Sequence, residues 1–230
     1  MAPPREERLT AIFAKHPTPG AVKTRLCPPL APREAAHLAE AMLRDGVARA
    51  RAGTFRTALV FAPAERAGWF QGAFPEVEEQ WPQVGAGLGQ RLAHHVARVF
   101  ERGLARTLVI VGSDQPLVPL ARLEEAHARL EEGADCVLGP DLGGGYYLVG
   151  LRRSVPELFT EVRMSSADMA AATLRLARAR GLSVAELPAH PDVDLPADLE
   201  HLRAALAARA DLPFVDHTRR ALAELALPTP

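Results

Sequence analysis

The chain has 230 residues, of which 48% are hydrophobic and 24% are charged, and its 27 Lys and Arg nearly balance its 28 Asp and Glu. These values exclude a disordered or fibrous chain and argue against bulk binding of nucleic acid. The length fits one large α/β domain. Two cysteines, Cys27 and Cys136, offer neither a disulfide framework nor zinc-ligand spacing. No apolar run suggests a signal peptide or a membrane span, so we expect a cytoplasmic protein.

Short apolar segments alternate with amphipathic ones along the chain. The apolar segments predict strands at 10–14, 56–62, 106–112, 135–139, 146–151 and 182–187. The amphipathic segments predict helices at 33–52, 90–102, 120–130, 166–180 and 196–209, whereas 63–90 is expected to be irregular. This alternation predicts a three-layer α/β/α fold with a mostly parallel, mixed sheet. We expect residues 1–210 to form a single domain and 211–230 a C-terminal helical arm or tail that could serve a homodimer.

The loop after the first predicted strand combines cations with glycine. Arginine occurs 25 times in the chain and lysine only twice, yet both lysines, Lys15 and Lys23, fall in this loop together with Arg25. Backbone N–H groups around Pro19 and Gly20 would add donors for a polyanion such as phosphate. The alternative is a solvated basic loop, since such side chains are common on surfaces.

Acidic residues follow the clearest strand and precede the last predicted helix. Asp114 stands in Gly-Ser-Asp-Gln-Pro directly after strand 106–112, where a carboxylate can hold a divalent metal that bridges phosphate oxygens. Either Asp192 or Asp194, two acids before Pro196, could complete such a site. The alternatives are a turn cap for Asp114 and ordinary helix-start chemistry for the later acids.

A run of three glycines, 143–145, precedes both tyrosines of the protein, Tyr146 and Tyr147. Glycines in such a run would let the backbone approach a sugar or a phosphate closely. A structural hairpin with aromatic residues in the core explains the same pattern.

Taken in order, the motifs resemble a known bacterial family. They read K-x-P-x-P-G-x-V-K-T-R-L, L-G-x-R-L, G-S-D-x-P, G-P-x-x-x-G-G-Y-Y-L-x-G and D-V-D-x-P-x-D-L, over about residues 9–203. This order resembles the DUF2064 or "transferase 1" proteins, which are related to nucleotide-diphospho-sugar transferases of the glycosyltransferase-A fold. The K-T-R-L element also looks like the loop of 2-phospholactate guanylyltransferase, which leaves the exact reaction open.

The resemblance implies a nucleotide bound over the first strand–loop–helix unit, with Mg²⁺ or Mn²⁺ as cofactor. Asp114 and Asp194 match the metal ligands, and Asp114 and Asp141 are the candidate catalytic residues, with His16 a weaker candidate base. The expected phosphate- or nucleotide-binding residues are Lys15, Pro19, Gly20, Lys23, Arg25, Gly89 and Arg91. The expected substrate pocket comprises Gly144, Gly145, Tyr146, Ser165 and Asp192.

The chain departs from the family pattern at three positions. Gly87 and Gly143 stand where members usually carry aspartate, and Met164 stands where they usually carry tryptophan. The missing carboxylates bear on acceptor binding and on catalysis.

These features predict a metal-dependent transferase that takes a glycosyl group from a nucleotide sugar to a small-molecule acceptor. One alternative is a nucleotidyltransferase that joins an NTP to a phosphorylated small acid or sugar and releases pyrophosphate. The other is a non-catalytic nucleotide-sugar-binding protein, for which the two replaced aspartates argue.

Overall fold

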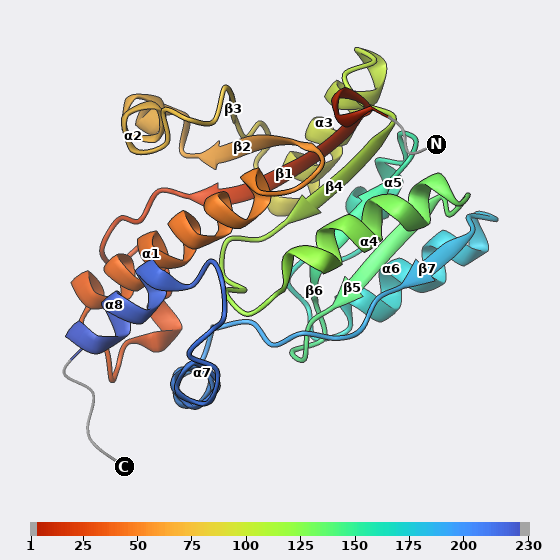
Figure 1. Cartoon of the computed structure of the whole chain (residues 1–230). Helices are drawn as coiled ribbons and strands as arrows, with labels where there is room; N and C mark the ends of the chain where they lie inside the picture. The colour runs from red at the N-terminus through yellow and green to blue at the C-terminus, as the bar shows by residue number, and fades with distance from the viewer. Residues whose placement is uncertain (1–3, 226–230) are drawn as a thin grey trace.

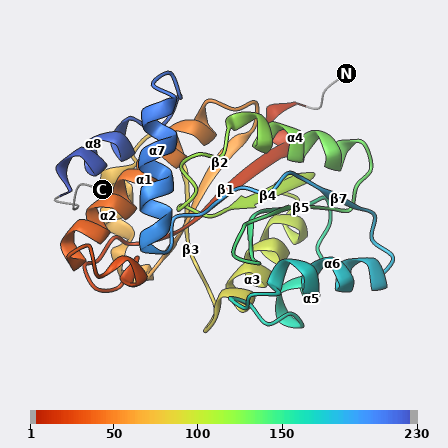
Figure 2. The ribbon, with the colours of Figure 1, turned by 90° about the horizontal axis from the view of Figure 1, so that it is seen from below.

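The computed structural model describes residues 4–225 and consists of one seven-stranded sheet between two layers of helices (Figures 1 and 2). The strand order is β3-β2-β1-β4-β6-β5-β7. β6 runs antiparallel to both β4 and β5, and the other neighbouring pairs are parallel. The mixed, mostly parallel α/β/α sheet predicted from the sequence is therefore confirmed. The strands are β1 (Arg8–Lys15), β2 (Arg56–Ala62), β3 (Glu79–Pro82), β4 (Thr107–Val111), β5 (Cys136–Pro140), β6 (Tyr146–Leu151) and β7 (Val184–Glu186).

The helices divide between the two faces of the sheet, and Figure 2 shows this sheet between its helical layers. The first face is covered by α1 (Pro32–Arg51), α2 (Ala67–Ala73) and α4 (Leu120–Glu131). The second is covered by α3 (Leu88–Glu101), α5 (Glu157–Thr160) and α6 (Met169–Ala179). The prediction that 63–90 is irregular was wrong, since α2 and β3 lie there. Both elements are too short to show a clear periodicity in the sequence. They are stabilised by burial against the rest of the fold. In the described part of the chain, no helix is long and apolar enough to span a membrane.

Alternate residues of the central strands enter different cores. In β1, Ile12 and Ala14 pack with α1 and α4, whereas Leu9 and Ala11 pack with α3 and its neighbours. This two-sided burial explains why the central strands read as continuous apolar runs. The carboxyl ends of β1, β2 and β4 meet at one edge of the sheet, where open α/β sheets bind ligands.

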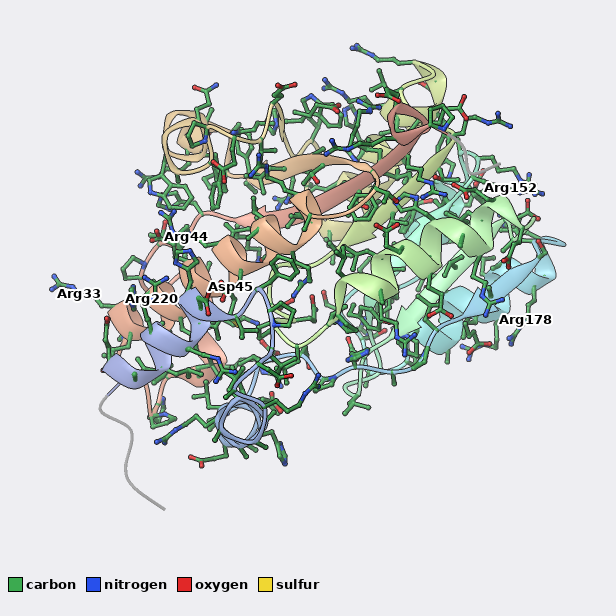
Figure 3. The ribbon with its side chains drawn as sticks, viewed as in Figure 1. Arg33, Arg44, Asp45, Arg152, Arg178 and Arg220 are labelled. Atoms are coloured by element: carbon green, nitrogen blue, oxygen red, sulfur yellow. The ribbon has the colours of Figure 1, made fainter. Side chains whose placement is uncertain are left out.

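A third apolar core lies on the outer side of α1, under α7 (Pro196–Ala208) and α8 (Asp216–Glu224). Leu38 and Met42 of α1 contribute to it, as do Leu199 and Leu202 of α7. α8 lies beside α1 in Figure 1, and Asp45 of α1, labelled in Figure 3, accepts hydrogen bonds from the first N–H groups of α8. These contacts attach residues 211–225 to α1, while 226–230 of the predicted arm lie outside the described residues.

A buried histidine joins α4 to the centre of the sheet. The imidazole of His127 has no exposed surface, with Nε2 3.0 Å from the hydroxyl of Thr10 and Nδ1 2.8 Å from that of Thr107. Burial, with a smaller contribution from Arg8, lowers the pKa of His127 to about 3. The ring is therefore neutral at ordinary pH and links β1, β4 and α4 through hydrogen bonds.

Acid should destabilise the protein through this residue. Between pH 6.5 and about 3 the unfolded imidazole binds a proton that the folded one does not, so stability falls as pH falls. At about pH 5 the loss from His127 alone amounts to about 2 kcal/mol. Urea unfolding at about pH 7 and about pH 5 measures it. His127→Gln should be less stable at the higher pH but lose about 2 kcal/mol less on acidification; an equal loss in both proteins would contradict this role.

Candidate functional site

Three segments that are distant in the chain converge at the carboxyl edge of the sheet around Lys23. Its ammonium Nζ lies 2.8 Å from Oδ2 of Asp114, in the loop after β4, and 3.7 Å from Oδ1 of Asp194, just before α7. Only 9% of the Lys23 side chain is exposed. Arg25 forms a second ion pair with Asp194. The structure therefore brings together two predicted cations with the two predicted metal ligands.

The local backbone aims Lys23 inward. Lys23 adopts the left-handed conformation, with φ of 48° and ψ of 35°, directly before the short 3₁₀ helix η2 (Thr24–Leu26). This conformation is uncommon for a residue with a side chain. Burial lowers the pKa of the Lys23 amine, but the charges of Asp114, Asp194 and Asp192 outweigh burial and raise it above its ordinary value. Lys23 is thus a fixed positive charge among carboxylates.

The segment before α7 is held alongside the end of β5. The N–H of His190 donates to the carbonyl of Pro140 over 3.1 Å, and that of Val193 donates to the carbonyl of Asp114 over 3.2 Å. The hydroxyl of Tyr147 donates to the carbonyl of Pro188 over 3.2 Å. Backbone contacts therefore place Asp192 between the loop after β4 and the glycine-rich turn.

Two further carboxylates face this meeting point. Asp141 is oriented by the turn, since its Oδ1 accepts hydrogen bonds from the N–H groups of Gly143 and Gly145 at 2.8 and 2.7 Å. Asp192 is partly buried, and burial followed by the negative charges of Asp114 and Asp141 raises its pKa. The site is consequently a region of concentrated negative charge, offset by Lys23 and Arg25.

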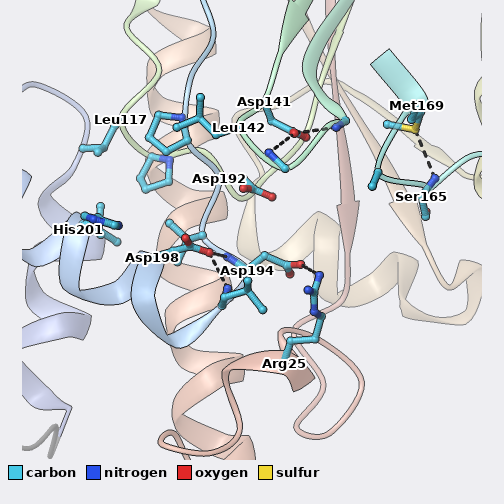
Figure 4. Close-up of a pocket in the computed structure, with 18 of the residues that line it drawn as sticks. Arg25, Leu117, Asp141, Leu142, Ser165, Met169, Asp192, Asp194, Asp198 and His201 are labelled. Carbon is cyan, nitrogen blue, oxygen red and sulfur yellow. Dashed lines mark hydrogen bonds and ion pairs between the residues drawn. The ribbon is translucent and has the colours of Figure 1, made fainter. Parts of the chain in front are cut away.

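Two adjoining cavities open at this site, and they share a wall. The larger has a volume of about 700 Å³ and is shown in Figure 4, and the smaller has a volume of about 450 Å³. Both are lined by Arg25, Asp141, Asp192 and Asp194. A molecule in one cavity would therefore meet a molecule in the other across these four side chains.

Most of the predicted site residues line one cavity or the other. Besides the shared residues, the smaller cavity is lined by Lys15, Lys23, Asp114 and Tyr146. The larger is lined by Gly145 and Ser165, and also by Gly143, one of the two glycines that replace a family aspartate. The predicted cationic loop and the predicted substrate pocket thus occupy neighbouring spaces.

Five predicted site residues are not among the described residues that line the two cavities. For some of them, contacts within the fold explain the residue type without a ligand. A Cβ on Gly89 would lie 2.2 Å from the carbonyl oxygen of Phe159, so this glycine allows α3 to approach α5. Arg91 donates from Nε to the carbonyl of Gly85 and so holds the loop before α3. The other predicted residues outside these linings are Pro19, Gly20 and Gly144, the last of which packs against Ala167.

His16, the weaker candidate base, contacts aromatic residues. Its Nδ1 is 2.7 Å from the hydroxyl of Thr18, and its ring packs edge-on against Trp69 at 4.7 Å between centroids. Burial, followed by the charge of Arg66, lowers its pKa. His16 does not appear among the described residues that line either cavity, so the structure separates it from the carboxylates.

Sequence reasoning missed much of the larger cavity. Its lining includes Leu117 in the loop after β4, the exposed Leu142 in the glycine-rich turn, and Asp198, His201 and Leu202 of α7. The N-terminal proline and acid of α7 were visible in the sequence, but they indicated only a helix start. Nothing in the sequence showed that this helix end would face residues 141–145.

Asp114 and Asp194 are the carboxylates here that could hold a divalent cation bound to phosphate. Asp114 and Asp194 both direct an oxygen at the Lys23 ammonium, so their oxygens converge on one cationic position. Among the described residues no group of three or more His, Cys, Asp or Glu is arranged to hold a metal by itself. Mg²⁺ commonly takes one or two carboxylates and completes its coordination with substrate phosphates and water. The two carboxylates fit that mode.

Comparisons with known proteins agree with this architecture. A family model described as an uncharacterised protein conserved in bacteria, DUF2064, matches residues 43–166. A solved Desulfovibrio desulfuricans protein, provisionally assigned as a nucleotide-diphospho-sugar transferase, is 27% identical with a TM-score of 0.84, covering 94% of this chain and 96% of that one. No protein of curated function matches.

More distant structures share the fold alone. A Leptospira borgpetersenii cytidylyltransferase has a TM-score of 0.59 at 12% identity, over 97% of this chain and 99% of that one. Rv0371c of Mycobacterium tuberculosis, in complex with manganese, has a TM-score of 0.51 at 19% identity, over 85% of this chain and 97% of that one. The chain therefore has the fold of nucleotide-diphospho-sugar transferases and cytidylyltransferases.

The glycine-rich turn offers a matched pair of substitutions. Gly144 has φ of +90°, and a Cβ there would lie 1.8 Å from the carbonyl oxygen of Ala167, whereas a Cβ on Gly143 makes only ordinary contact with Asp141. We expect Gly144→Ala to destabilise the fold by about 2 kcal/mol or more and Gly143→Ala by less than about 0.5 kcal/mol. Thermal unfolding measures both, and equal effects would show that packing does not require Gly144.

Proposed function

This chain belongs to the DUF2064 family of proteins conserved in bacteria, and we propose that it is a metal-dependent transferase that moves a glycosyl group from a nucleotide sugar to a small-molecule acceptor. The observation that carries the proposal is the pair of cavities with a common wall of Arg25, Asp141, Asp192 and Asp194. Group transfer needs two substrates held next to each other with charged groups at the point of reaction, and these four side chains border both cavities. The Desulfovibrio desulfuricans structure supports the broader assignment to nucleotide-sugar-related transferases.

The donor would occupy the smaller cavity. Its volume of about 450 Å³ falls within the range of small-molecule sites. It lies at the carboxyl ends of β1 and β4, and Lys15 and Arg25 supply exposed cations for the diphosphate. Lys23 adds a buried charge that is already oriented by Asp114. The three cations in this cavity would therefore contact the diphosphate of the donor.

Asp114 and Asp194 would hold Mg²⁺ or Mn²⁺ beside the diphosphate. When bound, the cation neutralises charge on the departing nucleoside diphosphate. Lys23 and Arg25 already pair with these two carboxylates and would contribute to the same electrostatic stabilisation. In this proposal, one ammonium and one guanidinium group would lie beside the leaving group, next to the carboxylates that hold the cation.

Asp141 would accept the proton of the acceptor. One of its oxygens is fixed by the N–H groups of Gly143 and Gly145, and the side chain lines both cavities. As the bond from the anomeric carbon to the diphosphate oxygen breaks, the acceptor oxygen bonds to that carbon. The hydroxyl proton passes to the Asp141 carboxylate.

Placing aspartate at Gly87 and Gly143 tests the alternative that the chain binds a nucleotide sugar without catalysing transfer. A Cβ on Gly87 meets nothing within 4 Å, and one on Gly143 lies 3.5 Å from Asp141 Oδ1. The double variant Gly87→Asp and Gly143→Asp should therefore fold. Transfer by the double variant alone, with none by the wild type, would make the natural chain a nucleotide-sugar-binding protein.

The released product distinguishes glycosyl from nucleotidyl transfer. We expect incubation with nucleotide sugars and Mn²⁺ to release a nucleoside diphosphate, measured by chromatography, because the bond that breaks lies at the anomeric carbon. Incubation with nucleoside triphosphates is the matched reaction. Release of pyrophosphate there, without nucleoside diphosphate from any sugar donor, would overturn the proposal in favour of a nucleotidyltransferase.

Asp114→Asn tests the metal-assisted nucleotide site independently of turnover. Amide replacement keeps the shape but removes the charge, so most of the Mn²⁺-dependent nucleotide affinity should disappear. Asp168→Asn, at an exposed carboxylate outside both described linings, is the matched control. Thermal shift with and without Mn²⁺ gives the affinity, since ligands that bind the folded state stabilise it. Unchanged affinity with an intact circular dichroism spectrum would place the metal elsewhere.

A further inference from the structure

The larger cavity carries an excess of negative charge. Its described lining contains Asp141, Asp192, Asp194 and Asp198, against Arg25 as its only Lys or Arg. Arg25 is already paired with Asp194. A phosphate or carboxylate entering here would meet no unpaired Lys or Arg among these residues and would be repelled by several carboxylates.

The helix end in this cavity does not reverse that preference. The N-terminus of a helix attracts anions through its free N–H groups. At the start of α7, however, the carboxylate of Asp198 already accepts hydrogen bonds from the N–H groups of Asp194 and Leu195, at 2.9 and 2.6 Å. The Asp198 carboxylate lies in the first turn of α7 and therefore offsets the positive end of the helix; Figure 4 draws its two hydrogen bonds.

One side of the same cavity is apolar. Leu117, Val193 and Leu202 line it, and Leu142 and Leu195 at its edge keep 71% and 42% of their surface exposed. Exposed leucines that surround a cavity can gain free energy by contact with an apolar ligand group. The cavity therefore combines an apolar surface with a carboxylate-rich one.

We infer that the larger cavity takes an uncharged or cationic molecule that carries a hydroxyl or amino group on an apolar body, and that phosphorylated and carboxylated molecules are excluded. The inference rests on the proposed function in treating this molecule as the glycosyl acceptor. Its hydroxyl or amino group would face Asp141 and Asp192, and its apolar body would contact the leucines. A nucleotide diphosphate and a divalent ion in the smaller cavity largely cancel in charge, so they leave this preference in place.

Three probes of similar size test the inference on the full chain without nucleotide. Leucinol is cationic, 4-methyl-1-pentanol is neutral and 4-methylpentanoate is anionic, while all three share a branched apolar chain. Ligand-observed NMR titration up to about 50 mM should give the tightest binding for leucinol and at least roughly five-fold weaker binding for 4-methylpentanoate. Equal or tighter binding of the anion, or no binding of any probe, would overturn the inference.

Two variants locate the binding in this cavity. Asp192→Asn removes one charge and should reduce the ratio of leucinol to 4-methylpentanoate affinity, whereas Glu101→Gln, on the exposed end of α3, should leave it unchanged. Leu142→Ala should weaken all three probes by a similar factor, because each loses the same apolar contact. If Asp192→Asn leaves the ratio of the two affinities unchanged, the probes bind outside this cavity and the inference is overturned.

Failure of this inference and failure of the proposed function give different results. If nucleotides stabilise the protein with Mn²⁺ while the anionic probe binds best, the transferase proposal stands and the acceptor class is wrong. If leucinol binds as expected while no nucleotide stabilises the protein, the cavity preference stands and the transferase proposal fails.

Discussion

The candidate site depends on one ion pair, that of the largely buried Lys23 with the partly exposed Asp114. An ammonium with a side chain only 9% exposed is costly to bury unless carboxylates surround it, and Asp114 and Asp194 supply them. Because these carboxylates belong to the loop after β4 and the segment before α7, the pairing requires three distant segments to meet. The same pairing places Asp194, one of the residues that line both cavities, beside Lys23.

Two buried polar residues of helix α1 hold neighbouring segments of the chain. The guanidinium of its buried Arg49 donates to the carbonyl of Pro116 over 3.0 Å and so holds the loop that carries Asp114. Its buried Asp45 accepts hydrogen bonds from the start of α8, which secures the C-terminal part of the chain. The two polar residues lie one turn apart on a helix whose other buried residues are apolar. The same helix therefore holds the loop that carries Asp114 and, separately, the start of α8.

Charge is distributed differently on the two sides of the shared wall. The smaller cavity contains all the Lys residues of the chain and the ion-paired Asp114, and it suits a polyanion with an accompanying cation. The described lining of the larger cavity also contains four carboxylates, but Arg25 is its only Lys or Arg, and it adds leucines. Under the proposed function, this asymmetry would give the donor and the acceptor separate cavities, and Asp141 lines both of them. Electrostatic repulsion would then keep the anionic donor out of the larger cavity.

The amino-acid sequence by itself determined the layered α/β fold and the edge of the sheet at which the candidate site residues lie. Periodicity marks buried strands and amphipathic helices, and the motifs that follow strands β1 and β4 place Lys23 and Asp114 at strand ends. It did not reveal α2 and β3, whose short segments are stabilised by packing. Only the tertiary structure decided that Lys23 contacts Asp114, 91 residues away, that Gly89 and Gly144 are required by close backbone approach, and that α7 contributes His201 and Leu202 to a cavity. Local sequence records which residues favour a strand, helix or turn, whereas charge pairing and cavity shape depend on which distant segments meet.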